Sequence, residues 1–278
     1  MRKIFCLVAM VFMVVGASAQ DELKSLFVEK FVNNSQTNDI TVQNLRQEIM
    51  SGITNSGRVT VVDESTLAGT DIPTSKRDRL KFLGEKGFNF VLEGTLNSIL
   101  QQKSISKDKQ TTYYEAVINY TLTLTDVESG TVKSSDTYKD SWSTGGTADE
   151  AILKAIEKAG DRMKKYVNDN FKVEAIIKAL DDIDQKKNAV KTCYVSTGSD
   201  MGIEKGQIFE VFANLEVAGE PIRKKIAEIK ADEVMSGTMT HCSVKSGGAE
   251  IKKYFDEKIV LTVVSRAKKE FGLGTLGL

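Results

Sequence analysis

Histidine, proline, cysteine and tryptophan are scarce in this chain of 278 residues, which contains one histidine, two prolines, three cysteines and one tryptophan. A single histidine excludes a histidine-rich metal site, and three cysteines are too few for a zinc-finger array. Two prolines exclude a proline-rich linker. An excess of one charge is also lacking, because 38 basic residues balance 38 acidic ones. This balance argues against a nucleic-acid partner.

Long apolar runs are missing after the N-terminus, where residues 1–19 have the pattern of a secretory signal peptide. Two basic residues precede the apolar stretch Ile4–Val15, which is too short to span a bilayer, and Ala17-Ser18-Ala19 is a small-x-small cleavage site. We therefore expect cleavage after Ala19 and export to the periplasm or the medium. Cys6 stands near the start of the apolar stretch and not after it, so neither a lipid anchor nor stable membrane insertion is predicted.

Only Cys193 and Cys242 remain once the signal peptide is removed. In an oxidising compartment such a pair can form a disulfide. The alternative is two small thiols buried in a sheet. The spacing in the sequence does not give the geometry of the pair, so both interpretations stay open.

Strand-like and helix-like patterns alternate over residues 20–171, which predicts a sheet covered by helices. Apolar residues at helical spacing, with glycines after the first two segments, predict helices at Thr41–Ser56, Ser75–Lys86 and Ala148–Phe171. Apolar and polar residues alternate from Tyr114 to Leu124, and a glycine turn follows, so this segment should form a hairpin with Thr131–Trp142. The other predicted strands are Ser25–Val32, Arg58–Asp63 and Phe88–Gln102.

The pattern changes after residue 171. Residues 172–187 are predicted to form a highly charged connecting helix, and residues 188–267 contain short strands with glycine turns. The strands are predicted at Ala189–Thr197, Gln207–Asn214, Ile222–Met235, Gly237–Val244 and Lys258–Arg266. Five short strands at this spacing predict a small β-barrel, followed by a tail at residues 268–278. The predicted fold class is therefore α+β, with an N-terminal mixed sheet covered by helices and a C-terminal small barrel.

Three motifs of the first domain occur in the order typical of one family. They are Asn55-Ser56-Gly57-Arg58 leading into Val59–Asp63, the segment Gly87–Gly94, and the hairpin Leu122–Val132. With the helix at 148–171 after them, they resemble the family that includes the curli secretion channel CsgG, the penicillin-binding-protein activator LpoB and the N-terminal domain of TolB. The resemblance implies a mixed sheet with helices and a role in the cell envelope.

Two glycine-containing segments of the second domain, Tyr194–Gly198 and Met201–Gln207, bracket a tight reversal of the chain. They resemble the C-terminal barrel of the flagellar assembly protein T family. Together the two resemblances imply an assembly or accessory role in the envelope and not catalysis.

Residues with obvious chemistry are few. The glycine pattern Gly272–Gly277 matches a dinucleotide motif, but only Leu278 follows it, where a helix would be needed. His241 stands beside Cys242 in a predicted strand, so the two side chains point to opposite faces. Clusters such as Asp181, Asp182 and Asp184 are explained by a solvated charged face. We therefore predict no catalytic residue, no metal ligand and no cofactor.

Three aromatic residues, Tyr113, Tyr138 and Trp142, lie around the predicted hairpin. Aromatic side chains are enriched at protein interfaces, so these residues are candidates for a partner-binding surface. The alternative is a second buried face beneath a helix.

The sequence favours an exported, non-enzymatic binding or assembly protein of the cell envelope. It would act through contacts with protein partners, which include further copies of itself. The alternative is a periplasmic regulator that binds and activates a cell-wall synthase. A hydrolase that uses a pair of carboxylates is the third hypothesis, and it would require a deep acidic cleft.

Overall fold

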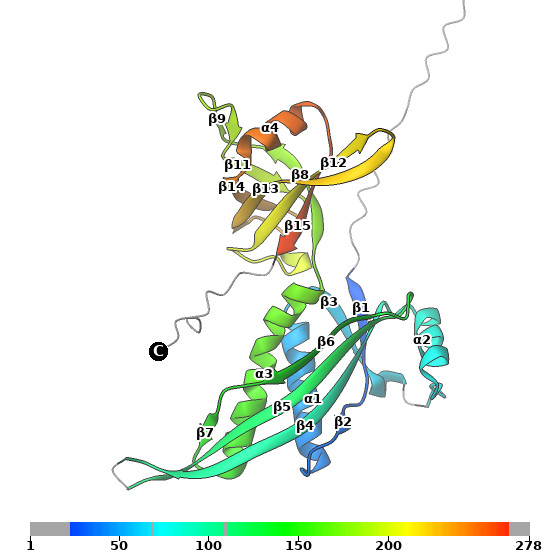
Figure 1. Ribbon diagram of the computed structural model, residues 1–278, viewed down its shortest axis with the longest axis vertical. Coiled ribbons are helices and arrows are strands. Elements are labelled where there is room, and N and C mark those ends of the chain that lie inside the picture. Colours follow the sequence, from blue (N-terminus) through cyan, green and yellow to red (C-terminus); the bar gives the residue numbers. More distant parts are fainter. Residues whose placement is uncertain (1–22, 68, 108–109, 267–278) are drawn as a thin grey trace, which may run out of the picture.

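Two domains lie end to end in the computed structural model, which describes residues 23–67, 69–107 and 110–266 (Figure 1). The first domain is a mixed sheet packed against helices, and the second is a closed barrel. The predicted α+β class and the order of the two domains are therefore confirmed. The predicted signal peptide and the C-terminal tail lie outside the described residues. No helix in the described part of the chain is long and apolar enough to cross a membrane.

The sheet of the first domain has seven strands. They are β1 (Lys24–Val28), β2 (Val32–Asn33), β3 (Val59–Asp63), β4 (Phe90–Ile105), β5 (Thr112–Asp126), β6 (Val132–Lys139) and β7 (Ser143–Gly145). The order is β3-β1-β4-β5-β6, and β2 pairs with β4 while β7 pairs with β5. Strand β1 is parallel to β3 and β4, whereas β4, β5 and β6 are antiparallel. The long β4–β5 hairpin reaches the end of the molecule farthest from the barrel (Figure 1).

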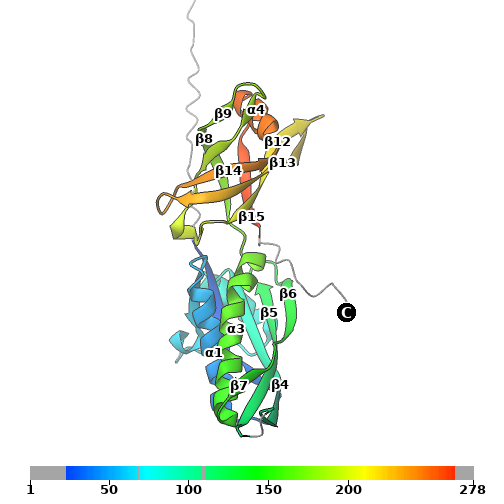
Figure 2. The ribbon, with the colours of Figure 1, turned by 90° about the vertical axis from the view of Figure 1, so that its left-hand side faces the viewer.

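Two helices cover one face of this sheet, α1 (Asp39–Thr54) and α3 (Ala148–Asn170), and Figure 2 shows them side by side. Each begins at a residue whose side chain accepts a hydrogen bond from the first turn, Asn38 for α1 and Thr147 for α3. Their apolar stripes form one core cluster with the buried alternate residues of β5, such as Ile118, Tyr120 and Leu122, and α3 is the helix that lies against β5. This cluster is the core of the first domain.

A smaller apolar cluster lies on the other face of the sheet. The 3-10 turn η1 (Glu64–Leu67) and the helix α2 (Lys76–Glu85) cover it. Leu83 of α2 is fully buried against Phe27 of β1 and Val91 of β4. The cover reaches only this part of the sheet, which leaves the rest of that face without a helix among the described residues.

The predicted connecting helix at residues 172–187 is wrong. These residues form strand β8 (Glu174–Leu180) and the short strand β9 (Ile183–Asp184). Alanine, leucine, lysine and glutamate give β8 a local preference for helix. The tertiary structure overrides it, because β8 pairs with two other strands and closes the barrel, with Ile177 buried inside.

The barrel has six strands in the order β11-β14-β13-β12-β15-β8. The other five are β11 (Thr192–Val195), β12 (Ile208–Val217), β13 (Glu220–Val234), β14 (Thr240–Ser246) and β15 (Leu261–Arg266). Strand β10 (Ala189–Val190) pairs with β9 outside the barrel. A helix that the sequence did not predict, α4 (Gly248–Asp256), adds Ile251 to the core. The 3-10 turn η2 (Ser199–Met201) precedes β12.

The two domains meet at a close backbone contact. Gly202 follows η2 with a left-handed φ of 62°, and a Cβ atom at this position would lie 2.1 Å from the carbonyl oxygen of Ser56 in the first domain. Glycine is therefore required for two reasons, its backbone conformation and the space available. Beside this contact, Lys164 of α3 forms an ion pair of 2.5 Å with Glu204 of the barrel domain.

We expect Gly202→Ala to weaken the domain junction. The added methyl group should lower the free energy of unfolding by about 2 kcal/mol or more, since a strained left-handed residue alone costs about 1–2 kcal/mol. The measurement is urea unfolding of the two domains. Gly219→Ala is the matched control, because Gly219 also has a positive φ, 86°, but no other group lies within 4 Å of the place that a methyl group would take there. Equal losses of stability in the two variants would contradict the role of the contact with Ser56.

Candidate partner-binding surface

The sheet of the first domain has an inner face, which packs on α1 and α3, and an outer face. On the inner face lie the alternate residues of β5 from Tyr114 to Leu124. The intervening residues, such as Tyr113 and Thr121, therefore point to the outer face. The α2 cluster includes residues of β1, the start of β4 and Val127 just after β5, and no described helix covers the outer face of the rest of β5 and β6.

Hydroxyl and amide side chains form hydrogen bonds across the outer face. The Oγ1 atoms of Thr121 on β5 and Thr137 on β6 are 2.9 Å apart, and Thr123 and Ser135 form a similar pair at 3.0 Å. On the other side of β5, Asn97 donates to Thr121 at 2.9 Å. Such cross-strand pairs stabilise the sheet and form a polar surface.

An apolar patch interrupts this polar surface near the far end of the hairpin. Leu100 of β4, which is 47% exposed, pairs with Val117 of β5. Trp142 is 42% exposed and directly precedes β7, whose Ser143 pairs with Ala116, the residue before the buried Val117. An exposed patch of large apolar side chains surrounded by polar groups is typical of an interaction site.

The structure brings two of the three predicted surface residues to this region and separates the third. Tyr113 is on the outer face, four residues before Val117, and Trp142 lies at its edge. Tyr138 is half-buried on the inner side, where its ring stacks on Tyr120 with the ring centroids 5.2 Å apart. Their role as a partner-binding surface stays a prediction.

Tyr138 is held by charged groups next to α3. The guanidinium group of Arg162 lies 5.4 Å from the centre of the Tyr138 ring and donates a hydrogen bond to Asp140. Burial raises the pKa of Tyr138 to about 12, so its hydroxyl group is neutral at physiological pH. These contacts fix the end of β6 against α3.

Leu100 was not among the predicted surface residues. It stands within the predicted strand Phe88–Gln102, but the register of β4 shifts at a bulge between Leu96 and Ser98. A bulge changes which residues point to each face. No sequence pattern marks this bulge, so the outward position of Leu100 depends on the tertiary structure.

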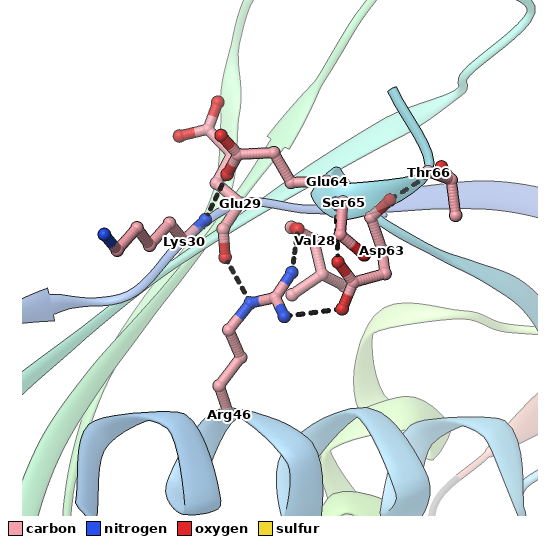
Figure 3. Close-up of polar contacts among 8 residues, drawn as sticks. All are labelled: Val28, Glu29, Lys30, Arg46, Asp63, Glu64, Ser65 and Thr66. Carbon is pink, nitrogen blue, oxygen red and sulfur yellow. Dashed lines mark hydrogen bonds and ion pairs between the residues drawn. The ribbon is translucent and has the colours of Figure 1, made fainter. Parts of the chain in front are cut away.

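Arg46 connects α1 to the carboxyl ends of two parallel strands (Figure 3). Its guanidinium group donates to the carbonyl oxygens of Val28, the last residue of β1, at 2.7 Å and of Glu29 at 2.8 Å. It also donates to the carboxylate of Asp63 in β3 at 2.5 Å. The hydrogen bond from Arg46, together with hydrogen bonds from Ser65, lowers the pKa of Asp63 to about 2. This network holds α1 against the ends of β1 and β3, and the carboxylate of Asp63 pairs with the charge of Arg46.

Glu29 lies next to this network and faces α2. Its carboxylate is 3.1 Å from Nε of Arg79, and Arg79 also approaches Glu93 at 3.7 Å. Burial raises the pKa of Glu29 to about 7, against the opposite effect of Arg79, and the charges of Glu93 and Glu64 raise it further. Such a pKa suits a general acid or base only where a cleft admits a substrate.

Three cavities in the described part of the chain do not lie at this carboxylate cluster. Two are at the domain junction, and the third is lined by residues from Ser199 to Ser236 of the barrel domain. None of the three is lined by Glu29, Glu64 or Glu93, so they give no support to a hydrolase built on these carboxylates.

His241 makes ordinary structural contacts. It lies in β14, 3.2 Å from the carboxylate of Asp181, with its ring near that of Tyr194. Within the residues that the structure describes, no group of three or more histidine, cysteine, aspartate or glutamate side chains could hold a metal ion.

Cys193 and Cys242 are directly opposite each other on the paired strands β11 and β14. Both side chains are fully buried in the barrel core as free thiols. Burial raises the pKa of Cys193 to about 12 and also raises that of Cys242, so both are protonated and unreactive at neutral pH. The two residues predicted as a disulfide pair are thus neighbours, and the disulfide itself stays a prediction.

Comparison with known proteins gives a family match for the N-terminal part of the chain. Residues 8–139 match the model of the family described as peptidoglycan-synthase activator LpoB. The match covers just under half of the chain and ends at the last residue of β6. This match supports the LpoB part of the predicted resemblance. The family description names an activator of an enzyme, which agrees with the prediction that the chain is not itself an enzyme. No curated protein matches the chain.

Several solved structures are similar to about half of the chain. The PelC dodecamer from Paraburkholderia phytofirmans is 17% identical with a TM-score of 0.32, over 50% of this chain and 86% of that one. The LpoB C-terminal domain from Escherichia coli is 14% identical with a TM-score of 0.31, over 46% and 89%. A minor lipoprotein from Acinetobacter baumannii is 9% identical with a TM-score of 0.29, over 52% and 92%. All three TM-scores are below 0.5, so these similarities add nothing to the family match.

Replacement of Glu29 by glutamine should stabilise the protein at pH 8 and have little effect at pH 5. The folded-state pKa is raised, so the contribution of Glu29 to stability is fully present below its ordinary pKa of 4.5 and is lost as the pH rises through about 7. Glutamine stays neutral, and we expect a gain of about 1–3 kcal/mol at pH 8. Urea unfolding at the two pH values measures this gain.

The control for this measurement is Glu85→Gln, which changes an exposed carboxylate of α2. This variant should behave like the unchanged protein at both pH values. A stability difference for Glu29→Gln that is the same at pH 5 and pH 8 would rule out the shifted titration of Glu29.

Proposed function

We propose that this protein activates a peptidoglycan synthase of the cell envelope by direct contact. The observation that carries this proposal is the match of residues 8–139 to the LpoB family model, whose description names that activity. The predicted signal peptide would deliver the chain to the compartment in which such a synthase works. This function was the alternative in the sequence-based prediction, and the family match favours it over general assembly.

The outer face of the first domain is our candidate for the contact with the synthase. It combines polar groups from β5 and β6 with the exposed apolar side chains of Leu100 and Trp142. A few large apolar residues within a polar surround often provide most of the energy of a protein interface. The barrel would provide a second contact surface.

Binding and activity measurements with purified synthases from the same organism test this proposal. We expect the protein to bind one of them and to raise its rate of glycan polymerisation. The double variant Leu100→Ser, Trp142→Ala should weaken binding at least tenfold, because loss of two interface anchors costs more than about 1.4 kcal/mol. Ile40→Ser is the matched control, since Ile40 is 65% exposed but lies at the start of α1.

The two parts of the proposal fail in different ways. If no peptidoglycan synthase binds or is activated, the function is wrong. If a synthase is activated equally well by the double variant, the function stands and the assignment of the outer face is wrong.

A second candidate function is assembly of several copies of the chain. It is supported by a free strand edge, since β4 from Asn97 to Ile105 pairs with β5 on one side and with no described strand on the other. Such an edge is a template for an additional strand.

Light scattering after size exclusion of residues 20–278 tests assembly. A closed ring or other large oligomer would support it, whereas a monomer at concentrations up to about 100 µM, well above typical protein-complex Kd values, would exclude it.

A further inference from the structure

Arg58 is a buried cation at the domain junction, and no carboxylate of the described residues pairs with it. It stands just before β3 and is 5% exposed. Its guanidinium group donates to Oε1 of Gln207 at 2.7 Å and to Oγ of Ser265 at 3.4 Å, both in the barrel domain. Neither partner carries a charge, and Arg58 forms no ion pair within the described residues. Burial lowers its pKa to about 10, against the opposite effect of Glu204.

A buried charge without a counter-ion is costly, so protein interiors normally pair it with an opposite charge. The guanidinium group has five N–H donors, and its two observed hydrogen bonds leave donors available. The preferred partner for these donors is a planar or tetrahedral oxyanion, such as a carboxylate or a phosphate.

A cavity of about 340 Å³ gives access to Arg58. It lies between α1, α3 and the barrel domain, and Asn55, Lys164, Asn168, Glu204 and Gln207 are among its lining residues. A second cavity of about 550 Å³ shares Lys164 and Glu204 with the first and is also lined by Lys158, Arg162 and Lys205. The two cavities together form a polar cleft between the domains.

The ion pair between Lys164 and Glu204 stands where the two cavities meet. Both side chains are 63% exposed, and an ion pair in such a position contributes little to stability. Lys164 can therefore turn from Glu204 to an incoming anion at low cost. The ammonium group of Lys164 would then bind the same anion as the guanidinium group of Arg58, which lines the same cavity.

Two further carboxylates in the lining of the smaller cavity indicate which other groups the ligand should carry. Glu48 of α1 and Asp161 of α3 line the smaller cavity, and neither forms an ion pair within the described part of the chain. Carboxylates accept hydrogen bonds, so hydroxyl or amino groups are suited to face them.

We propose that the cleft between the two domains binds a small polar ligand through its carboxylate or phosphate group, which Arg58 and Lys164 hold, while its hydroxyl or amino groups face Glu48 and Asp161. Arg58, Lys164, Glu48 and Asp161 belong to the first domain, and Glu204 and Gln207 of the barrel domain complete the lining of the cavity. This site is separate from the outer face and does not depend on the proposed function.

Calorimetric titration of residues 20–278 with inorganic phosphate and with succinate tests the proposal, at an ionic strength held constant with chloride. We expect saturable binding of at least one anion with one site per chain. Lys164→Ala should weaken it about tenfold or more, because a hydrogen bond to a charged group is lost. Glu204→Gln should strengthen binding severalfold, because it removes the carboxylate that competes for Lys164.

Lys154→Ala is the control, since Lys154 is on the same helix but lines neither cavity and pairs with Glu150. Binding of phosphate alone would identify the ligand group as a phosphate, and binding of succinate alone would identify it as a carboxylate. The proposal is overturned if neither anion binds saturably up to about 10 mM, the weak end of specific affinities. It is also overturned if Lys164→Ala and Lys154→Ala weaken binding equally.

Discussion

Burial of one face of β5 under α3 is the constraint on which the first domain depends. The alternate residues of β5 pack on α3 within the core that both helices share, and this contact fixes which face of the sheet is inside. Side chains alternate between the faces of a strand, so the same contact fixes the residues of the outer face. The polar pairs and the apolar patch of that face are therefore positioned by packing on the opposite side of the sheet.

Two buried or half-buried arginines, Arg46 and Arg58, connect helices, strands and domains through hydrogen bonds at the borders of the apolar cores. Arg46 connects α1 to the ends of β1 and β3 through partners that satisfy its charge completely. Arg58 connects the first domain to the barrel, but its partners Gln207 and Ser265 are neutral. Arg46 has a carboxylate among its partners, whereas Arg58 has none within the described residues, and this difference makes Arg58 the candidate for an anionic ligand.

The sequence-based predictions were right where the local sequence pattern was strong and wrong or missing where it was weak or misleading. The helix predicted at 148–171 agrees with α3 because its apolar stripe is long and Thr147 caps its start. The segment 172–187 was misassigned because its residues favour helix locally, and only the pairing of β8 with β11 and β15 makes it a strand. The helix α4 was missed because it has only nine residues and its N-cap residue, Gly247, has no side chain to mark the start.

The sequence by itself determined the two-domain α+β organisation, the amphipathic helices and the motif order that resembles a family, because periodicity and turn residues act over short distances. The tertiary structure alone decided the sixth strand of the barrel, the separation of Tyr138 from Tyr113 and Trp142, and the burial of Arg58. Each of these depends on contacts between residues far apart in the chain, such as Arg58 with Ser265. Local patterns do not contain such contacts, because they form only when separate elements pack together.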